Sequence, residues 1–79
     1  MIIMKEVLEA NGFKLLWQCS CGGTHNMTFG KTVNLKSYEV TIRPSQKSFT
    51  ISSSNTRIAA GKEDTLTQKL IENGIIKAV

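Results

Sequence analysis

The side chains best suited to chemistry are gathered in one short segment of the chain. Cys19, Cys21 and His25 lie within seven residues, in the stretch Cys-Ser-Cys-Gly-Gly-Thr-His. Thiolates and imidazoles are ligands that zinc prefers, and structural zinc sites have four of them. The chain has no other cysteine or histidine, so a site here needs a carboxylate such as Glu39 or a second copy of the trio. We treat the trio as an incomplete metal-ligand set and expect no bound cofactor.

The same segment has two further interpretations. In the structural one, Cys19 is a small core residue, Gly22 and Gly23 form a turn, and His25 continues into a strand. In the other, Cys21-Gly-Gly-Thr-His25 resembles the core of the CDGSH iron–sulfur family. That family places two further cysteine ligands upstream as a separate pair, and its acidic residue is replaced by Gly22 here. We therefore carry no iron–sulfur function over to this chain.

Catalysis has little support in the sequence. A cysteine nucleophile needs a base that is held by a third group beside a cleft, and nothing around Cys21 and His25 indicates either. The six acidic residues are scattered and form no recognisable pair for general acid–base catalysis. We expect a protein that is not an enzyme.

Basic side chains dominate the middle of the chain. Residues 11–62 contain seven cations and the single acid Glu39. Such a region suits an anionic partner, because neutralising phosphates releases counterions and gives affinity without base reading. The candidate contacts with nucleic acid or another anion are Arg43, Lys47 and Arg57. The competing interpretation is a solvated sheet face, since no two cations are adjacent.

Length and composition indicate one small globular domain over residues 1–79. A chain of this size buries only about 60 to 65% of the surface that its unfolded form exposes. The longest apolar runs, residues 1–4 and 15–17, are far shorter than the roughly 20 residues of a membrane span, and residues 1–10 lack a secretory pattern. Two cysteines separated by one residue do not suit an ordinary disulfide. We expect a cytoplasmic protein with no membrane contact.

Both ends of the chain have helical patterns. Residues 1–10 contain an apolar stripe, and Asn11-Gly12 followed by Phe13 is typical of a helix end. A hairpin turn at Asn-Gly is the competing interpretation. Near the other end, Thr65 and Gln68 have the spacing of a capping box. The apolar positions that share a face of this second helix are Leu66, Leu70 and Ile71, and Asn73-Gly74-Ile75 repeats the helix-end pattern.

Alternating apolar residues predict four strands between these helices. In residues 13–19 the apolar face holds Phe13, Leu15, Trp17 and Cys19, and residues 24–29 form its hairpin partner. Residues 30–37 are expected to be irregular. Residues 38–43 and 49–52 form a second hairpin, and residues 57–60 are a further candidate for a short edge strand.

The expected fold is therefore α+β, a four-stranded antiparallel meander with the N-terminal and C-terminal helices packed on one face. The expected function is that of a non-catalytic module that binds a protein partner or forms a homo-oligomer, because the core is small and a sheet edge is free. The alternative is a nucleic-acid-binding module that contacts the backbone. Base stacking has weak support, because all five aromatic residues fall on predicted apolar faces; Trp17 and Tyr38 are the best candidates for partial exposure.

Overall fold

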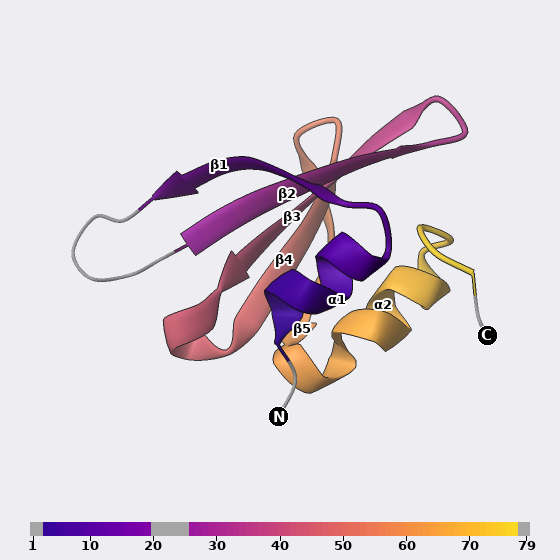
Figure 1. The fold of residues 1–79 in the computed structure, drawn as a ribbon. Coiled ribbons are helices and arrows are strands. Elements are labelled where there is room, and N and C mark those ends of the chain that lie inside the picture. The colour runs from indigo at the N-terminus through magenta and orange to yellow at the C-terminus, as the bar shows by residue number, and fades with distance from the viewer. Residues whose placement is uncertain (1–2, 20–25, 78–79) are drawn as a thin grey trace.

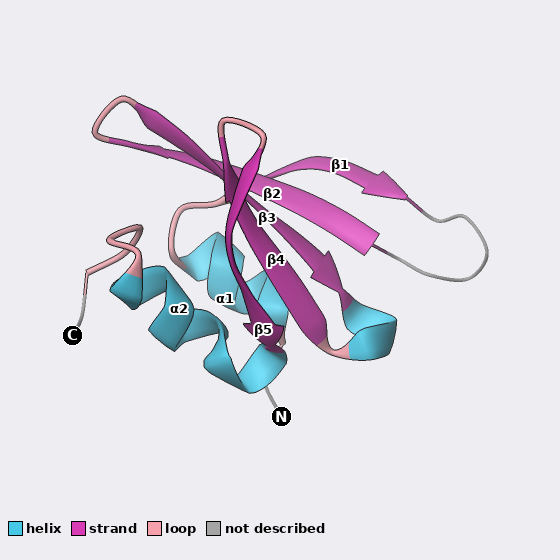
Figure 2. Ribbon diagram, turned by 180° about the vertical axis from the view of Figure 1, so that it is seen from behind, coloured by secondary structure: helices cyan, strands magenta, loops and turns pink. Residues whose placement is uncertain are grey.

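The chain folds into an antiparallel sheet covered on one face by two helices, as seen in a computed structural model that describes residues 3–19 and 26–77 (Figure 1). The elements are α1 (Met4–Ala10), β1 (Lys14–Cys19), β2 (Asn26–Val33), β3 (Lys36–Arg43), β4 (Ser48–Ser53), β5 (Thr56–Lys62) and α2 (Leu66–Glu72). Two 3-10 turns, η2 (Pro44–Gln46) and η3 (Glu63–Thr65), precede β4 and α2. The strands lie side by side in sequence order, and Figure 2 shows both helices on the same side of them. The predicted α+β class is confirmed.

The sheet has five strands instead of the expected four. β5 runs from Thr56 to Lys62 and pairs along the whole of β4. Residues 30–37 are also strand, apart from a two-residue turn at Asn34-Leu35. Both turn residues have positive φ, 51° and 69°, a geometry that glycine usually marks in the sequence. No glycine marks this turn in the sequence. The prediction that residues 30–37 are irregular was wrong.

The two helices end in the same way. At the end of α1, Gly12 has φ 88° and the N–H of Phe13 donates to the carbonyl of Leu8 over 3.0 Å. At the end of α2, Gly74 has φ 72° and Ile75 donates an equivalent bond of 2.9 Å. The residue after each glycine is buried against the core, which is the pattern of a Schellman end. Both predicted helix ends are confirmed, and the hairpin alternative at the first of them is wrong.

The start of α2 differs from the predicted capping box. The hydroxyl of Thr65 donates to the carbonyl of Lys62 over 2.8 Å, and the amide of Gln68 donates to the carboxylate of Glu72 over 3.0 Å. The η3 turn leads directly into the helix, so the Thr65 hydroxyl is used to close that turn and does not cap the helix.

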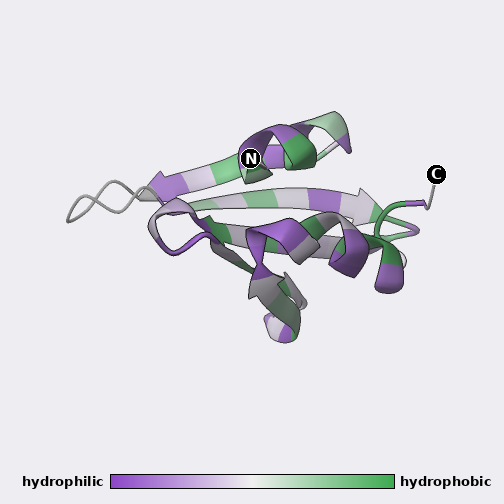
Figure 3. Ribbon diagram, turned by 90° about the horizontal axis from the view of Figure 1, so that it is seen from below, coloured by the Kyte–Doolittle hydropathy of each residue, from purple (hydrophilic) through white to green (hydrophobic). Residues whose placement is uncertain are grey.

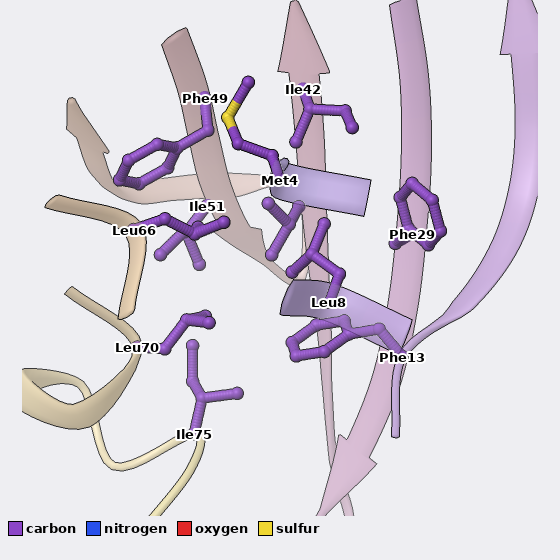
Figure 4. Packing of buried hydrophobic residues seen from close by; sticks show 11 residues of the cluster. Met4, Leu8, Phe13, Phe29, Ile42, Phe49, Ile51, Leu66, Leu70 and Ile75 are labelled. Atoms are coloured by element: carbon purple, nitrogen blue, oxygen red, sulfur yellow. The ribbon is translucent and has the colours of Figure 1, made fainter. Parts of the chain in front are cut away.

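One hydrophobic core lies between the helices and the sheet (Figure 4). Side chains of α1 and α2 converge there on the central strands β2, β3 and β4. Figure 3 shows how hydrophobic and hydrophilic residues intermix along each element, as the sequence pattern requires when one face is covered. The buried apolar residues are Met4, Leu8, Phe13, Phe29, Val40, Ile42, Phe49, Ile51, Leu66, Leu70 and Ile75.

The sheet face away from the helices is called the open face below. Directly paired residues of an antiparallel sheet point to the same side, so the register assigns side chains to this face. Its central row consists of Thr28, Thr41, Thr50 and Ala60. The hydroxyls of Thr28 and Thr41 lie 3.0 Å apart. Small and hydroxyl-bearing side chains therefore form the middle of the open face.

Candidate functional site

A β-bulge in the edge strand β1 turns Trp17 to the open face. Leu15 pairs with Phe29, but Trp17 pairs with Thr28, so Leu16 is an extra residue. Phe29 faces the helices and Thr28 faces away from them. Because directly paired residues point to the same side, Leu15 also faces the helices and Trp17 faces away. Trp17 is 54% exposed. The expectation that Trp17 shares the apolar face of Leu15 was wrong, because simple alternation does not reveal an inserted residue.

Leu16 also lies on the open face, in the space left by a glycine. A Cβ built on Gly30 would come within 2.7 Å of Leu16 Cδ1. Gly30 pairs with Glu39 on the open face, so the extra side chain of the bulge rests over the glycine position. A glycine within a strand typically marks such a close approach. Leu16 nevertheless stays 53% exposed, and Leu15 on the other face is 45% exposed.

The two edges of the sheet differ in their side chains. β5 carries Arg57 and Lys62, and its exposed large hydrophobic is Ile58, the extra residue of a second bulge. Charges and bulges are the devices that keep an edge strand from pairing with another chain. β1 has a bulge too, but residues 15–17 are three consecutive exposed apolar side chains. The edge at β1 is therefore the less protected one.

Four cations and one acid occupy the open face. The register places Glu39 there together with Lys14, Arg43, Arg57 and Lys62. The Nη1 of Arg43 donates to the hydroxyl of Thr50 over 2.8 Å, which holds the guanidinium along the sheet. Within residues 3–19 and 26–77, the one ion pair joins two residues of α2. The four cations are thus not neutralised by any carboxylate of the described chain.

The basic residues singled out in the sequence do not all lie together. Arg43 and Arg57 share the open face, in rows that are four residues apart along β3, or about 13 Å. Lys47 follows η2 with φ 52° and lines a mostly apolar hollow near α1. Lys14 and Lys62 were missed as members of the group. Extending the alternation of β5 past Ala60 was the signal that would have found Lys62.

A shallow hollow of about 510 Å³ lies beside β1 and reaches the open face. Its lining includes Lys14, Glu39 and the hydroxyl-bearing Thr32 and Ser37, next to the apolar Leu16. Gly30 also lines the hollow, where Leu16 occupies the space that a side chain at this position would take. The hollow thus offers charged and hydroxyl groups beside an apolar side chain.

The residues of the possible metal site lie at the limit of the described structure. Cys19 is the last residue of β1 and pairs through its backbone with Asn26. Cys21 and His25 fall outside the described residues, as does the side chain of Cys19. In the part of the chain that is described, no three histidine, cysteine or acidic residues are grouped as a metal site requires. Metal binding by the trio stays a prediction.

Comparisons with known proteins do not assign the chain to a family. The chain has no significant match among protein-family models, curated proteins or solved structures. Neither α1 nor α2, the helices of the described residues, has the length and apolarity that crossing a membrane requires.

Proposed function

We propose that the chain is a non-catalytic module that associates with a second copy of itself through the free edge of β1. The observation that carries this proposal is the run Leu15, Leu16 and Trp17, each 45 to 54% exposed on an edge strand. An edge strand offers unpaired N–H and C=O groups to another strand. Burying apolar side chains in the same contact contributes about 25 cal/mol for each Å².

The bulge makes β1 complementary to itself. Leu15 and Gln18 pair with residues of β2 that face the helices, so they face the helices as well, whereas Leu16 and Trp17 face the open side. The order in which the side chains face is therefore helix side, open side, open side, helix side, and it is symmetric about the bond between Leu16 and Trp17. Two β1 strands paired antiparallel about that bond oppose Leu16 with Trp17 and Leu15 with Gln18, so paired residues share a face. Lys14 stands opposite residue 19, and no two lysines meet.

This pairing has the symmetry of an ordinary homodimer. A two-fold axis perpendicular to the sheet relates the copies, and the two five-stranded sheets become one continuous sheet. Both open faces then lie on the same side, with Leu16 and Trp17 of each copy close to the axis. A small domain gains more from such burial than a large one, because its own core supplies limited stability.

A charge placed at the axis tests this proposal. We expect the wild-type chain to sediment as a dimer and Leu16→Lys to sediment as a monomer. Two like charges would then lie close to the axis, where Leu16 and Trp17 of the two copies are expected to meet. Ile58→Lys is the matched control: it adds the same charge at the bulge of the other edge strand and should leave the dimer intact. Circular dichroism of each variant checks that the fold is retained.

Two results would contradict the proposal. One is a wild-type chain that stays monomeric at concentrations on the order of 100 µM in sedimentation velocity, since a dimer of useful stability forms well below that. The other is dissociation by Ile58→Lys with no effect of Leu16→Lys, which would assign the contact to β5.

A further inference from the structure

The open face has two features that single-stranded nucleic acid requires of a protein surface. Proteins that bind single strands without sequence preference combine cations, which contact the phosphates, with aromatic rings, on which bases stack. The open face carries four cations without carboxylate partners in the described chain, and the exposed ring of Trp17. We propose that this face binds single-stranded nucleic acid. The proposal goes beyond self-association and does not require it, because Trp17 faces the open side in the monomer and in the proposed dimer alike.

The cations are spread across the sheet so that a backbone would meet them in turn. Arg43 pairs with Ser48, which pairs with Lys62, so their backbones lie two strand spacings apart, about 10 Å. Beyond the row of Trp17 and the threonines, Arg57 and Lys14 lie at the two edges of the next row of the face. The one acid in that row, Glu39, lies between them on β3 and leaves the face with a clear positive excess. Phosphates are anions that such a surface can neutralise.

Trp17 is the base-stacking residue of this surface. It is the single tryptophan of the chain and lies in the same row as the threonines of β2, β3 and β4. Thr28, directly opposite Trp17, is only 3% exposed, so the face is closely packed beside the exposed Trp17. An exposed aromatic ring beside small side chains leaves room for an unpaired base.

The single-stranded form is favoured over the duplex. Stacking on Trp17 needs a base whose flat face is free, and in a duplex both faces are already stacked. The described side chains of the open face include no second aromatic ring, and no helix projects from this face to enter a groove. Duplex DNA and other polyanions are therefore the competitors in the test.

Salt dependence measures the phosphate contacts. The probe is a labelled oligothymidylate of about 15 nucleotides, titrated at several salt concentrations around 150 mM. The double variant Arg57→Gln, Lys62→Gln should bind more weakly and reduce the log–log salt slope by about 1.4, or roughly 0.7 for each lost contact. The matched control, Lys5→Gln, Lys77→Gln, removes the same charge away from the open face and should leave the slope unchanged.

The fluorescence of Trp17 reports stacking directly, because no other tryptophan contributes. Oligothymidylate should quench this fluorescence as it binds. Trp17→Leu should weaken binding by about 5- to 100-fold, and Trp17→Phe, which retains a ring, by less. Sedimentation of both variants with and without the oligonucleotide separates a stacking effect from a change in association.

Four outcomes would overturn the proposal. The first is no binding near 150 mM salt, and the second is an equal loss of affinity in the control Lys5→Gln, Lys77→Gln. The third is binding without quenching of Trp17. The fourth is equal affinity for duplex DNA or heparin, which would show attraction to any polyanion. Because each of these can be observed on dimer or monomer, failure here leaves the self-association proposal to its own test.

Discussion

Leu35 is the most exposed large hydrophobic side chain of the described residues. It is 99% exposed at the tip of the hairpin between β2 and β3. Its φ of 69° lies in the left-handed region, which costs a residue with a Cβ roughly 1 to 2 kcal/mol. Asn34 before it is at φ 51°, so the pair forms the kind of turn in which Asn-Gly is preferred.

Replacing Leu35 by glycine should stabilise the protein. Leu35→Gly removes the strain at positive φ and an apolar side chain that contacts only solvent, with an expected gain of about 0.5 to 1 kcal/mol. Urea denaturation measures it as a higher midpoint at unchanged slope. Leu35→Ala is the control, because it shortens the side chain but keeps the Cβ and should stay near wild type. A lower midpoint for Leu35→Gly would mean that the leucine side chain stabilises the turn.

At the scale of elements, both helices depend on a glycine in the left-handed region followed by a buried hydrophobic residue. The side chains of Asn11 and Asn73 add the same bond at each end, donating to the carbonyls of Val7 over 2.7 Å and Lys69 over 2.8 Å. Each helix has only seven residues, too short to be stable by itself in water. Their ends and their packing must therefore supply most of their stability.

Gly74 allows the backbone contribution to be measured alone. A Cβ added there would meet no atom within 4 Å, so Gly74→Ala introduces only the strain of φ 72°. We expect a loss of about 1 kcal/mol, seen as a melting temperature lower by roughly 4 to 8 °C in a domain of this size. Gly74→Asn should lose less, because asparagine tolerates this conformation. Equal losses for the two variants would point to a cause other than backbone conformation.

At the scale of the whole molecule, stability depends on one core that both helices share. Leu8 of α1 and Leu70 of α2 are both fully buried against the sheet (Figure 4). The open face contributes little apolar burial, so within the described residues no second core compensates for damage to the first. The same arrangement leaves one face of the sheet free for a ligand and one edge free for a partner.

Truncation of one core residue should therefore affect the entire fold. Leu70→Ala is expected to lower the free energy of unfolding by about 2 to 5 kcal/mol, a large part of the roughly 5 to 15 kcal/mol of a typical domain. Chemical denaturation followed by circular dichroism measures the loss. Ile58→Ala, at a site 41% exposed, is the matched control and should change stability far less. A wild-type denaturation curve for Leu70→Ala would place α2 off the core.

Much of the fold follows from neighbours along the chain. The ends of α1 and α2 and the alternation in residues 38–43 and 49–51 are set by local contacts and by a period of two, so sequence reasoning found them. The candidate site was found only in part. Alternation within β3 suffices to place Arg43 on the open face, whereas Arg57 lies there only because the bulge at Ile58 interrupts the alternation of β5.

Only the tertiary structure decided the facing of Trp17 and the grouping of the basic residues. An inserted residue in β1 exists only relative to its partner β2, and the pairing that defines it joins residues that are distant in sequence. The same holds for Lys62, which joins Arg43 on the open face through two successive strand pairings. Sequence determined which residues alternate, and the register between strands determined which of them meet, because register depends on packing across the whole sheet.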